Sequence, residues 1–476
     1  MSGQKSVIKS FAWKAGERIL VQGLGLAIQI ILARLLLPED FAAIALITAI
    51  VNYLGLFVQS GLSVAIVQKD DLTEKDVATL TSVSLLVATL LFIVLFVAAP
   101  VISEYYNVGD LVWPIRVMGL SLFLYSFNSI QTGLLSRKMM FRTIFFRSLM
   151  AIPLSGVVGI AMAFGGMGIW ALVGYNMVNI LSMVIFMNMV PELRLNLGFS
   201  LQSARCLYSF SLKILGTSLI SAGGDTVRTM TIGKVYSPDK LAYYDRAYSY
   251  SALVTQVVNT SLASVLLPVF SRNQKDKSQL KNLARRSVGI SSLVMMPMLV
   301  GVAITAEPLV SILLTDKWIA CAPFLSLFCM LRIPGIITSI DRQVYLSLGK
   351  SQIGLYYECF LLAMNLMSLF LLIPYGIFAV AIGYTVIEFM GNFVLCIISS
   401  KVYDYSLRER FLDMIKSLSA SVIMAACGIM LLFTEMSLWT LLISQVILCF
   451  SVYFSLQLLF RNEDLCYIIQ RITKNK

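Results

Sequence analysis

The chain contains no histidine and few charged residues, and each shortage excludes a class of protein. Its 476 residues are 13% charged and 58% hydrophobic, whereas a soluble domain carries about 25% charged residues. This composition excludes an ordinary cytosolic enzyme, a disordered chain and a solvated nucleic-acid binder. Histidine is the commonest general base and metal ligand. Because it is missing, any coupling of function to proton movement must use a carboxylate.

Cysteines are few, and their spacing excludes two further kinds of protein. None of the eight belongs to a C-x-x-C pair, and the first 205 residues contain none. A disulfide scaffold or a zinc site would need such pairs or a regular framework. We therefore expect the cysteines to be small buried hydrophobic residues, and we expect no metal and no cofactor.

Long apolar runs dominate what is present. An apolar stretch of about 20 residues crosses a bilayer as a helix, and fourteen such stretches leave no room for a separate soluble domain. The sequence therefore predicts an all-α polytopic membrane protein. The predicted spans are approximately 12–36, 41–62, 77–99, 112–134, 144–164, 167–189, 207–233, 246–270, 286–305, 320–340, 353–373, 376–398, 415–433 and 438–460.

The positions of lysine and arginine predict the orientation of these spans. Of the 37 basic residues, 28 fall in segments on the side of the N-terminus, four on the other side and five within spans. Because cytoplasmic loops are enriched in Lys and Arg, both termini are predicted to be cytoplasmic. The formal net charge of +12 then lies mostly in these loops and indicates no nucleic-acid partner.

An internal repeat divides the spans into two sets. Pro38–Ala42 recurs as Pro238–Ala242, and Gly168–Tyr175 recurs as Gly376–Tyr384 with one inserted residue. Six spans are an even number, so the repeats are parallel. We predict two six-helix lobes at residues 1–200 and 201–400, with two extra helices and a cytoplasmic tail at 401–476.

With Arg147, Arg342 and Arg410 counted among the loop charges on the side of the N-terminus, nine ionisable residues remain inside the spans. They are Arg18, Arg34, Arg116, Arg228 and Arg332, and the acids Glu17, Asp225, Glu358 and Glu388. Charges in the hydrocarbon region are costly and usually face a cavity or a partner. Because guanidinium groups bind phosphate bidentately, the five arginines are candidate substrate-binding residues. Glu388 and Asp225 are candidate ion-coupling residues.

Depth in the membrane leaves alternatives open for four of these residues. Arg18, Arg34 and Arg116 lie near the ends of their spans. An arginine there can reach the interface, so anchoring and ligand binding both remain open. Glu388 is the deepest, and it is either a proton-titrating site or a hydrogen-bonded structural acid.

Asp225 and Arg228 lie three residues apart, hence on one helix face. They either pair with each other or expose Arg228 to substrate when Asp225 takes up a proton or an ion. Arg332 precedes Pro334, where a kink would widen a cavity. Pro153 and Pro297 are further kink candidates.

Tyrosines gather near residue 240, at a predicted outer interface. The cluster comprises Tyr236, Tyr243, Tyr244, Tyr248 and Tyr250. Such rings either stack on sugars or form an interfacial aromatic belt, and the position of this cluster favours the belt.

Several motifs resemble those of Wzx-type polysaccharide flippases of the multidrug/oligosaccharidyl-lipid/polysaccharide (MOP) exporter superfamily, with the WzxC-like branch most similar. They are Ala33–Phe41, Ser136–Arg142, Leu241–Tyr248, Leu267–Arg272, and Ala306–Pro308 running on to Lys317–Trp318. The similarity extends over roughly residues 10–400, and Arg34 lies within its first motif.

This resemblance implies a V-shaped pair of six-helix lobes in the bacterial inner membrane. It also implies translocation of undecaprenyl-pyrophosphate-linked glycan units to the periplasmic leaflet, for O-antigen, capsule or exopolysaccharide. Members are thought to use ion-coupled alternating access without ATP, which agrees with the absence of a G-x-x-x-x-G-K-[ST] phosphate loop. We expect a monomer in the bilayer, with a polysaccharide polymerase and a chain-length regulator as candidate partners.

Two rival functions make different demands on the sequence. A MATE-like drug or small-cation antiporter would need a net acidic cavity, whereas the spans hold five arginines and four acids. A membrane-bound glycan polymerase or glycosyltransferase would need a sizeable polar loop with catalytic carboxylates or histidine, and the loops here are short. We therefore predict a flippase and no enzyme.

Overall fold

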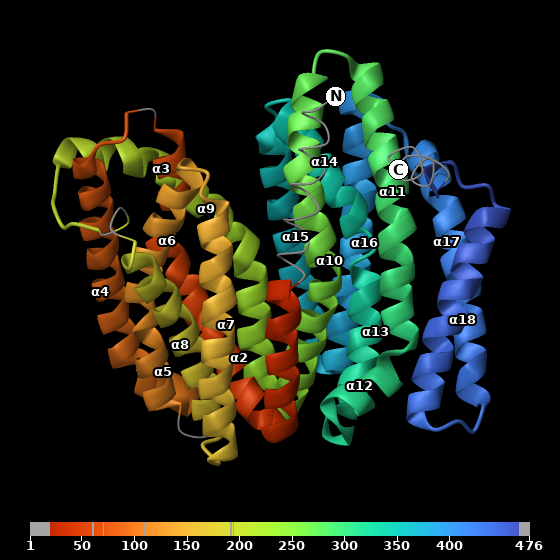
Figure 1. Ribbon diagram of the computed structural model, residues 1–476, viewed down its shortest axis with the longest axis horizontal. Helices are drawn as coiled ribbons and strands as arrows, with labels where there is room; N and C mark the ends of the chain where they lie inside the picture. The colour runs from red at the N-terminus through yellow and green to blue at the C-terminus, as the bar shows by residue number, and fades with distance from the viewer. Residues whose placement is uncertain are drawn as a thin grey trace. The chain divides into compact units, whose positions relative to one another are not determined.

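A computed structural model describes residues 20–465, apart from 60, 70, 109–110, 191–192 and 194. Every regular element in these residues is a helix (Figure 1), which confirms the predicted all-α class. The chain divides into two compact units. Their described parts are the N-terminal unit, from residue 20 to Ala242, and the C-terminal unit, from Tyr243 to residue 465.

The N-terminal unit is built from one apolar helix at Leu20–Leu35 and eight helices that follow it. These are α2 (Pro38–Gln59), α3 (Leu62–Gln68), α4 (Glu74–Tyr106), α5 (Val112–Gly119), α6 (Ser121–Arg137), α7 (Phe141–Phe164), α8 (Ile169–Asn188) and α9 (Leu201–Val235). Their apolar faces pack on one another, with Leu62, Ile66, Leu80 and Ile130 forming one buried cluster of α3, α4 and α6.

Local sequence signals fix where these helices begin and end. Thr73 caps α4, because its hydroxyl accepts from the Asp76 amide while the Asp76 carboxylate accepts from the Thr73 amide. This capping box satisfies two amides that lack a partner within the helix. Lys69 Nζ lies 2.6 Å from the same carboxylate and ties the end of α3 to the start of α4.

The C-terminal unit contains the rest of α10 and eight further α-helices. The elements are α10 (Pro238–Arg272), α11 (Lys277–Ile304), α12 (Ala306–Leu314), α13 (Ala322–Leu331), α14 (Gly335–Ser347), α15 (Ser351–Leu372), α16 (Ile377–Tyr403), α17 (Leu407–Met430) and α18 (Leu438–Leu459). Short 3₁₀ segments lie at Asp316–Cys321, Ile373–Tyr375 and Leu431–Phe433. The last two helices form a hairpin that packs on α11 (Figure 1).

Ten helices in the described residues are long and apolar enough to cross a membrane, so the protein is a multi-pass membrane protein. The count of fourteen stays a prediction. Two predicted spans, 207–233 and 246–270, lie in α9 and α10, each a continuous helix of 35 residues that does not count among the ten. The span at 12–36 lies partly outside the described residues.

The predicted spans at 112–134 and 320–340 are interrupted. At Leu120, the α5 helix gives way to α6, and the Ser121 hydroxyl donates to the Met118 carbonyl at 2.6 Å, competing with the helical ladder. At Pro334 the missing amide ends α13, so the Met330 carbonyl accepts from Ile333 instead. The kink predicted at Pro334 is thus a complete break between α13 and α14.

The units divide later in the chain than the lobes predicted from the repeat. The boundary lies between Ala242 and Tyr243, because α9 packs against α2, α3 and α4. A close approach accompanies this packing: a Cβ at Gly233 of α9 would lie 2.5 Å from a methyl carbon of Leu46. The lobes at 1–200 and 201–400 remain a prediction from the repeat.

Candidate functional site

The predicted arginines of the N-terminal unit occupy different environments. Arg18, like Glu17, lies outside the described residues. Arg34 is exposed near the end of its helix. Arg116 is half-buried, with its guanidinium 4.1 Å from the Phe96 ring centroid and 5.2 Å from that of Trp113. Because aromatic faces attract a cation, Phe96 and Trp113 of the same unit stabilise the position of the Arg116 side chain.

Asp225 and Arg228 pair with each other. Arg228 Nη2 lies 2.7 Å from Asp225 Oδ1, in the i, i+3 geometry expected on one helix face. The arginine side chain is 7% exposed and the aspartate side chain 49%. The carboxylate is therefore the accessible member of the pair.

Arg332 lies where α13 breaks before Pro334. Its guanidinium stacks 4.4 Å from the ring centroid of Tyr248 and donates to the Tyr248 carbonyl at 3.4 Å. Asn392 of α16 donates to the Pro334 carbonyl at 3.0 Å and to Thr338 at 3.1 Å. Asn392 of α16 therefore stabilises the chain at this break. Arg332 lies at the C-terminal end of α13, within the spanning region.

The tyrosine cluster packs inward. Tyr244 lies 4.9 Å and Tyr248 5.5 Å from the Phe328 ring centroid, both edge-on. Tyr243 is edge-on to Trp318 at 5.9 Å, and Tyr244 is 3% exposed. These three rings contact α13 and the segment before it, and the aromatic belt favoured by the sequence stays a prediction. They form part of the core around Arg332.

The two acids of α15 and α16 differ in their surroundings. Glu358 Oε1 lies 2.6 Å from Nη2 of Arg342. Arg342 lies on α14 and not in a loop as predicted. Glu388 is half-buried on α16. Its role as a proton-titrating site or as a structural acid remains a prediction.

One buried arginine was not among the predicted site residues. Arg147, on α7, is 8% exposed. Its Nη1 donates to Asn128 Oδ1 at 2.8 Å and to Thr132 Oγ1 at 3.2 Å, both on α6. The sequence did carry a signal, since position 147 falls inside the span predicted at 144–164. The basic loop before this span obscures the signal, because Arg147 is grouped with the charges of that loop.

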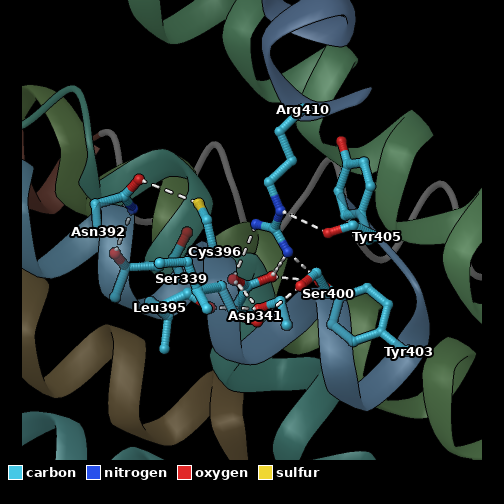
Figure 2. Close-up of polar contacts among 12 residues, drawn as sticks. Ser339, Asp341, Asn392, Leu395, Cys396, Ser400, Tyr403, Tyr405 and Arg410 are labelled. Carbon is cyan, nitrogen blue, oxygen red and sulfur yellow. Dashed lines mark hydrogen bonds and ion pairs between the residues drawn. The ribbon is translucent and has the colours of Figure 1, made fainter. Parts of the chain in front are cut away.

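A buried ion pair was also missed. Arg410 of α17 and Asp341 of α14 meet through two hydrogen bonds of 2.9 and 3.0 Å, and both side chains are at most 1% exposed (Figure 2). Ser399 donates to Asp341 at 2.8 Å, and Tyr403 donates to the same carboxylate. Arg410 also stacks on Tyr405, 4.3 Å from its ring centroid.

A second layer of charges continues this cluster toward α11. Arg285 binds Asp413 with Nε and Nη2, at 2.9 and 2.7 Å, and Tyr405 donates to Asp413 at 2.7 Å. Burial and the Asp413 charge raise the pKa of Tyr405 well above its usual range, so the phenol remains a neutral donor. Lys281 pairs with Glu409 at 2.7 Å. Together these contacts fasten α17 to α11, α14 and α16.

The signal for this cluster was weak in the sequence. Asp341 follows directly after the span predicted at 320–340, and Arg410 precedes the span predicted at 415–433. The hydropathy pattern therefore places both residues in loops. In the structure α14 extends to Ser347 and α17 begins at Leu407. Because the pair is fully balanced, it is structural rather than a binding site. Among the described residues no group of three His, Cys, Asp or Glu side chains is placed to hold a metal.

Comparison with known proteins assigns the family. A family model described as "Polysaccharide biosynthesis protein" matches residues 31–323. The chain belongs to this family. The match confirms the resemblance to Wzx-type polysaccharide flippases.

Two relatives and one solved structure illustrate the similarity. The succinoglycan biosynthesis transport protein ExoT of Rhizobium meliloti (strain 1021) is 25% identical over 73% of this chain and 70% of its own length. The lipopolysaccharide biosynthesis protein WzxC of Escherichia coli (strain K12) is 22% identical over 90% and 89%. The lipid II flippase MurJ in an inward closed conformation matches 94% of this chain and 98% of its own, at a TM-score of 0.78 and 14% identity. The MurJ likeness shows the fold.

Proposed function

We propose that this polysaccharide biosynthesis protein is a flippase for undecaprenyl-pyrophosphate-linked oligosaccharide units. It moves them from the cytoplasmic to the periplasmic leaflet of a bacterial inner membrane, with both of its termini in the cytoplasm. The observation that carries the proposal is the family match over residues 31–323. The products built from these units are an O-antigen, a capsule or an exopolysaccharide.

The basic residues of the spans give the proposal its chemistry. The substrate combines an anionic pyrophosphate with a lipid tail and sugars, and guanidinium groups suit the phosphates. Arg228 and Arg332 are the leading candidates. Arg228 pairs with the accessible carboxylate of Asp225, and Arg332 lies at the helix break before Pro334. Arg34, Arg116 and Arg18 complete the proposed set.

Coupling to an ion gradient belongs to the same proposal. Protonation of Asp225 would weaken its pair with Arg228 at 2.7 Å and free the guanidinium for phosphate, which links ion binding to substrate binding. Glu388 is the second candidate for coupling. Alternating access would then expose these residues to each side of the membrane in turn. A MATE-like antiporter remains the alternative, but no contact in the described residues favours it.

Reconstitution tests this function directly. The protein is placed in liposomes that contain a fluorescent undecaprenyl-pyrophosphate oligosaccharide, and the leaflet of the label is read by dithionite quenching under an imposed proton or sodium gradient. We expect gradient-dependent translocation that is lost in Arg228→Ala and Arg332→Ala and retained in Arg142→Ala, a change at an exposed position. Translocation of a cationic drug but not of the lipid would overturn the proposal in favour of the antiporter.

A further inference from the structure

The N-terminal unit contains a buried cation that no carboxylate among its described residues neutralises. Arg147 is 8% exposed, and no carboxylate in the described residues lies within ion-pair distance of it. Removing a guanidinium from water without a counter-charge is strongly unfavourable. Hydrogen bonds to the neutral Asn128 and Thr132 return only part of this cost, so the site is electrostatically incomplete.

The geometry of the guanidinium shows which edge remains for a ligand. Both hydrogen bonds leave from Nη1, whereas the buried Nε donates to no acceptor in the described residues. The edge formed by Nε and Nη2 is the one with which Arg285 holds the two oxygens of Asp413. Arg147 therefore keeps a bidentate, oxyanion-binding edge that the fold has not used.

The surroundings favour a phosphoryl group at this edge. Asn128 and Thr132 share a face of α6 with Tyr125, which donates to Asn52 of α2 at 2.9 Å, so three polar side chains line this face of the helix. Arg147 lies six residues into α7, about 9 Å from its start. The segment just upstream of α7 carries Arg137 and Lys138, and these charges favour an anion.

We propose that Arg147 is the anchor of a phosphoryl-binding site in the N-terminal unit, with Asn128 and Thr132 orienting its guanidinium. This inference rests on the proposed function, since it supplies a contact for the phosphates of a lipid-linked substrate. The same chemistry suits the headgroup of an anionic phospholipid. The site is separate from the Asp225–Arg228 pair, which the fold already balances.

The test measures binding to the full-length protein in phosphatidylcholine nanodiscs. Three probes are compared: inorganic pyrophosphate, undecaprenyl pyrophosphate and phosphatidylglycerol. Arg147→Gln removes the charge while keeping a polar side chain, and Arg142→Gln removes an exposed charge from the same helix as a matched control. We expect Arg147→Gln to weaken pyrophosphate and undecaprenyl pyrophosphate binding by about tenfold or more. Arg142→Gln should change it by less than about twofold.

Stability is measured in parallel, because a structural arginine would show itself there. We expect Arg147→Gln to melt within about 3 °C of the wild type, since the substitution removes a charge without a counter-ion. A loss confined to undecaprenyl pyrophosphate and pyrophosphate assigns the site to the transported lipid. An equal loss for phosphatidylglycerol assigns it to phospholipid headgroups, and both results support a phosphoryl site.

Two outcomes overturn the inference. One is unchanged binding of all three probes in Arg147→Gln, and the other is a loss no larger than that in Arg142→Gln. Neither outcome affects the proposed function if the wild-type protein still translocates the labelled lipid in liposomes. Absence of translocation by the wild type, with Arg147-dependent pyrophosphate binding retained, would instead contradict the proposed function and leave this site in place.

Discussion

Arg410 of the C-terminal unit and Arg147 of the N-terminal unit are both buried in helices, but their charges are balanced in different ways. Arg410 meets the two oxygens of Asp341 and a tyrosine hydroxyl. Among the described residues, Arg147 meets only an amide and a hydroxyl. The first arrangement is complete within the protein and holds helices together. The second lacks an anion among the described residues, and the phosphates of the proposed lipid-linked substrate would supply one.

The largest expected effect is at the balanced pair. Arg410→Ala leaves the fully buried Asp341 without its counter-charge, and breaking a buried pair from one side costs about 3–5 kcal/mol of folding free energy. Thermal unfolding in detergent should show a large drop in melting temperature. The double variant Asp341→Leu/Arg410→Met should recover most of it, because an apolar pair of similar volume is often neutral. A wild-type melting curve for Arg410→Ala would show that the pair does not fasten α17.

The converse change supplies Arg147 with an anion from the protein. Asn128→Asp is nearly isosteric and places a carboxylate at the present 2.8 Å contact. A charge-assisted bond should stabilise the protein by about 1–3 kcal/mol while abolishing pyrophosphate binding through competition for the guanidinium. Melting temperature and binding are measured on the same sample, with Asn128→Ser as the uncharged control. Tight pyrophosphate binding by Asn128→Asp would contradict the conclusion that Arg147, unlike Arg410, is available to bind an anion because it lacks a carboxylate partner.

A smaller effect is expected when one hydrogen bond of the Asp341 cluster is removed. Tyr403→Phe deletes the hydroxyl that donates to Asp341 and accepts from Arg410, and leaving buried charged groups less well satisfied costs about 1–3 kcal/mol. Transport should continue at temperatures well below melting. Loss of transport in a folded Tyr403→Phe protein would mean that the cluster participates in the transport cycle, contrary to a purely structural role.

The smallest effect is expected at the Arg342–Glu358 pair. The arginine side chain is 54% exposed and the glutamate side chain 26%, so the pair is close to the surface type whose contribution is about 0–1 kcal/mol. Glu358→Gln should therefore shift the melting temperature only slightly. A shift as large as that of Arg410→Ala would show that the contribution of these ion pairs to folding stability does not follow their burial.

Hydropathy predicted most of the fold, because apolar runs report on the membrane directly. It did not predict the interruption at Leu120, which depends on a serine hydroxyl inside an otherwise apolar stretch. The proline at position 334 did predict a kink, although not a complete break between two helices. The boundary between the compact units depends on the packing of α9 on α2, which is a tertiary preference, and the lobes at 1–200 and 201–400 stay a prediction from the repeat. A sequence repeat records ancestry, and it does not state which neighbours a helix will contact.

Candidate charges were harder to predict than helices. Asp225 and Arg228 are close in sequence, so their pairing was among the predicted alternatives. Asp341 and Arg410 are 69 residues apart, and only the folded helices bring them together. Arg147 is grouped with the charges of the basic loop before it, whereas the first turns of α7 place its side chain against α6. Charges at the ends of predicted spans therefore need the structure before their burial is known.

The buried Asp341–Arg410 ion pair, which joins α14 to α17, has an evolutionary consequence. Asp341 and Arg410 both lie beyond residue 323, where the family match ends, and each would be a liability without the other. A relative that lost the terminal hairpin would keep an unbalanced acid in its core unless position 341 changed as well. The two positions should therefore be inherited, and lost, together.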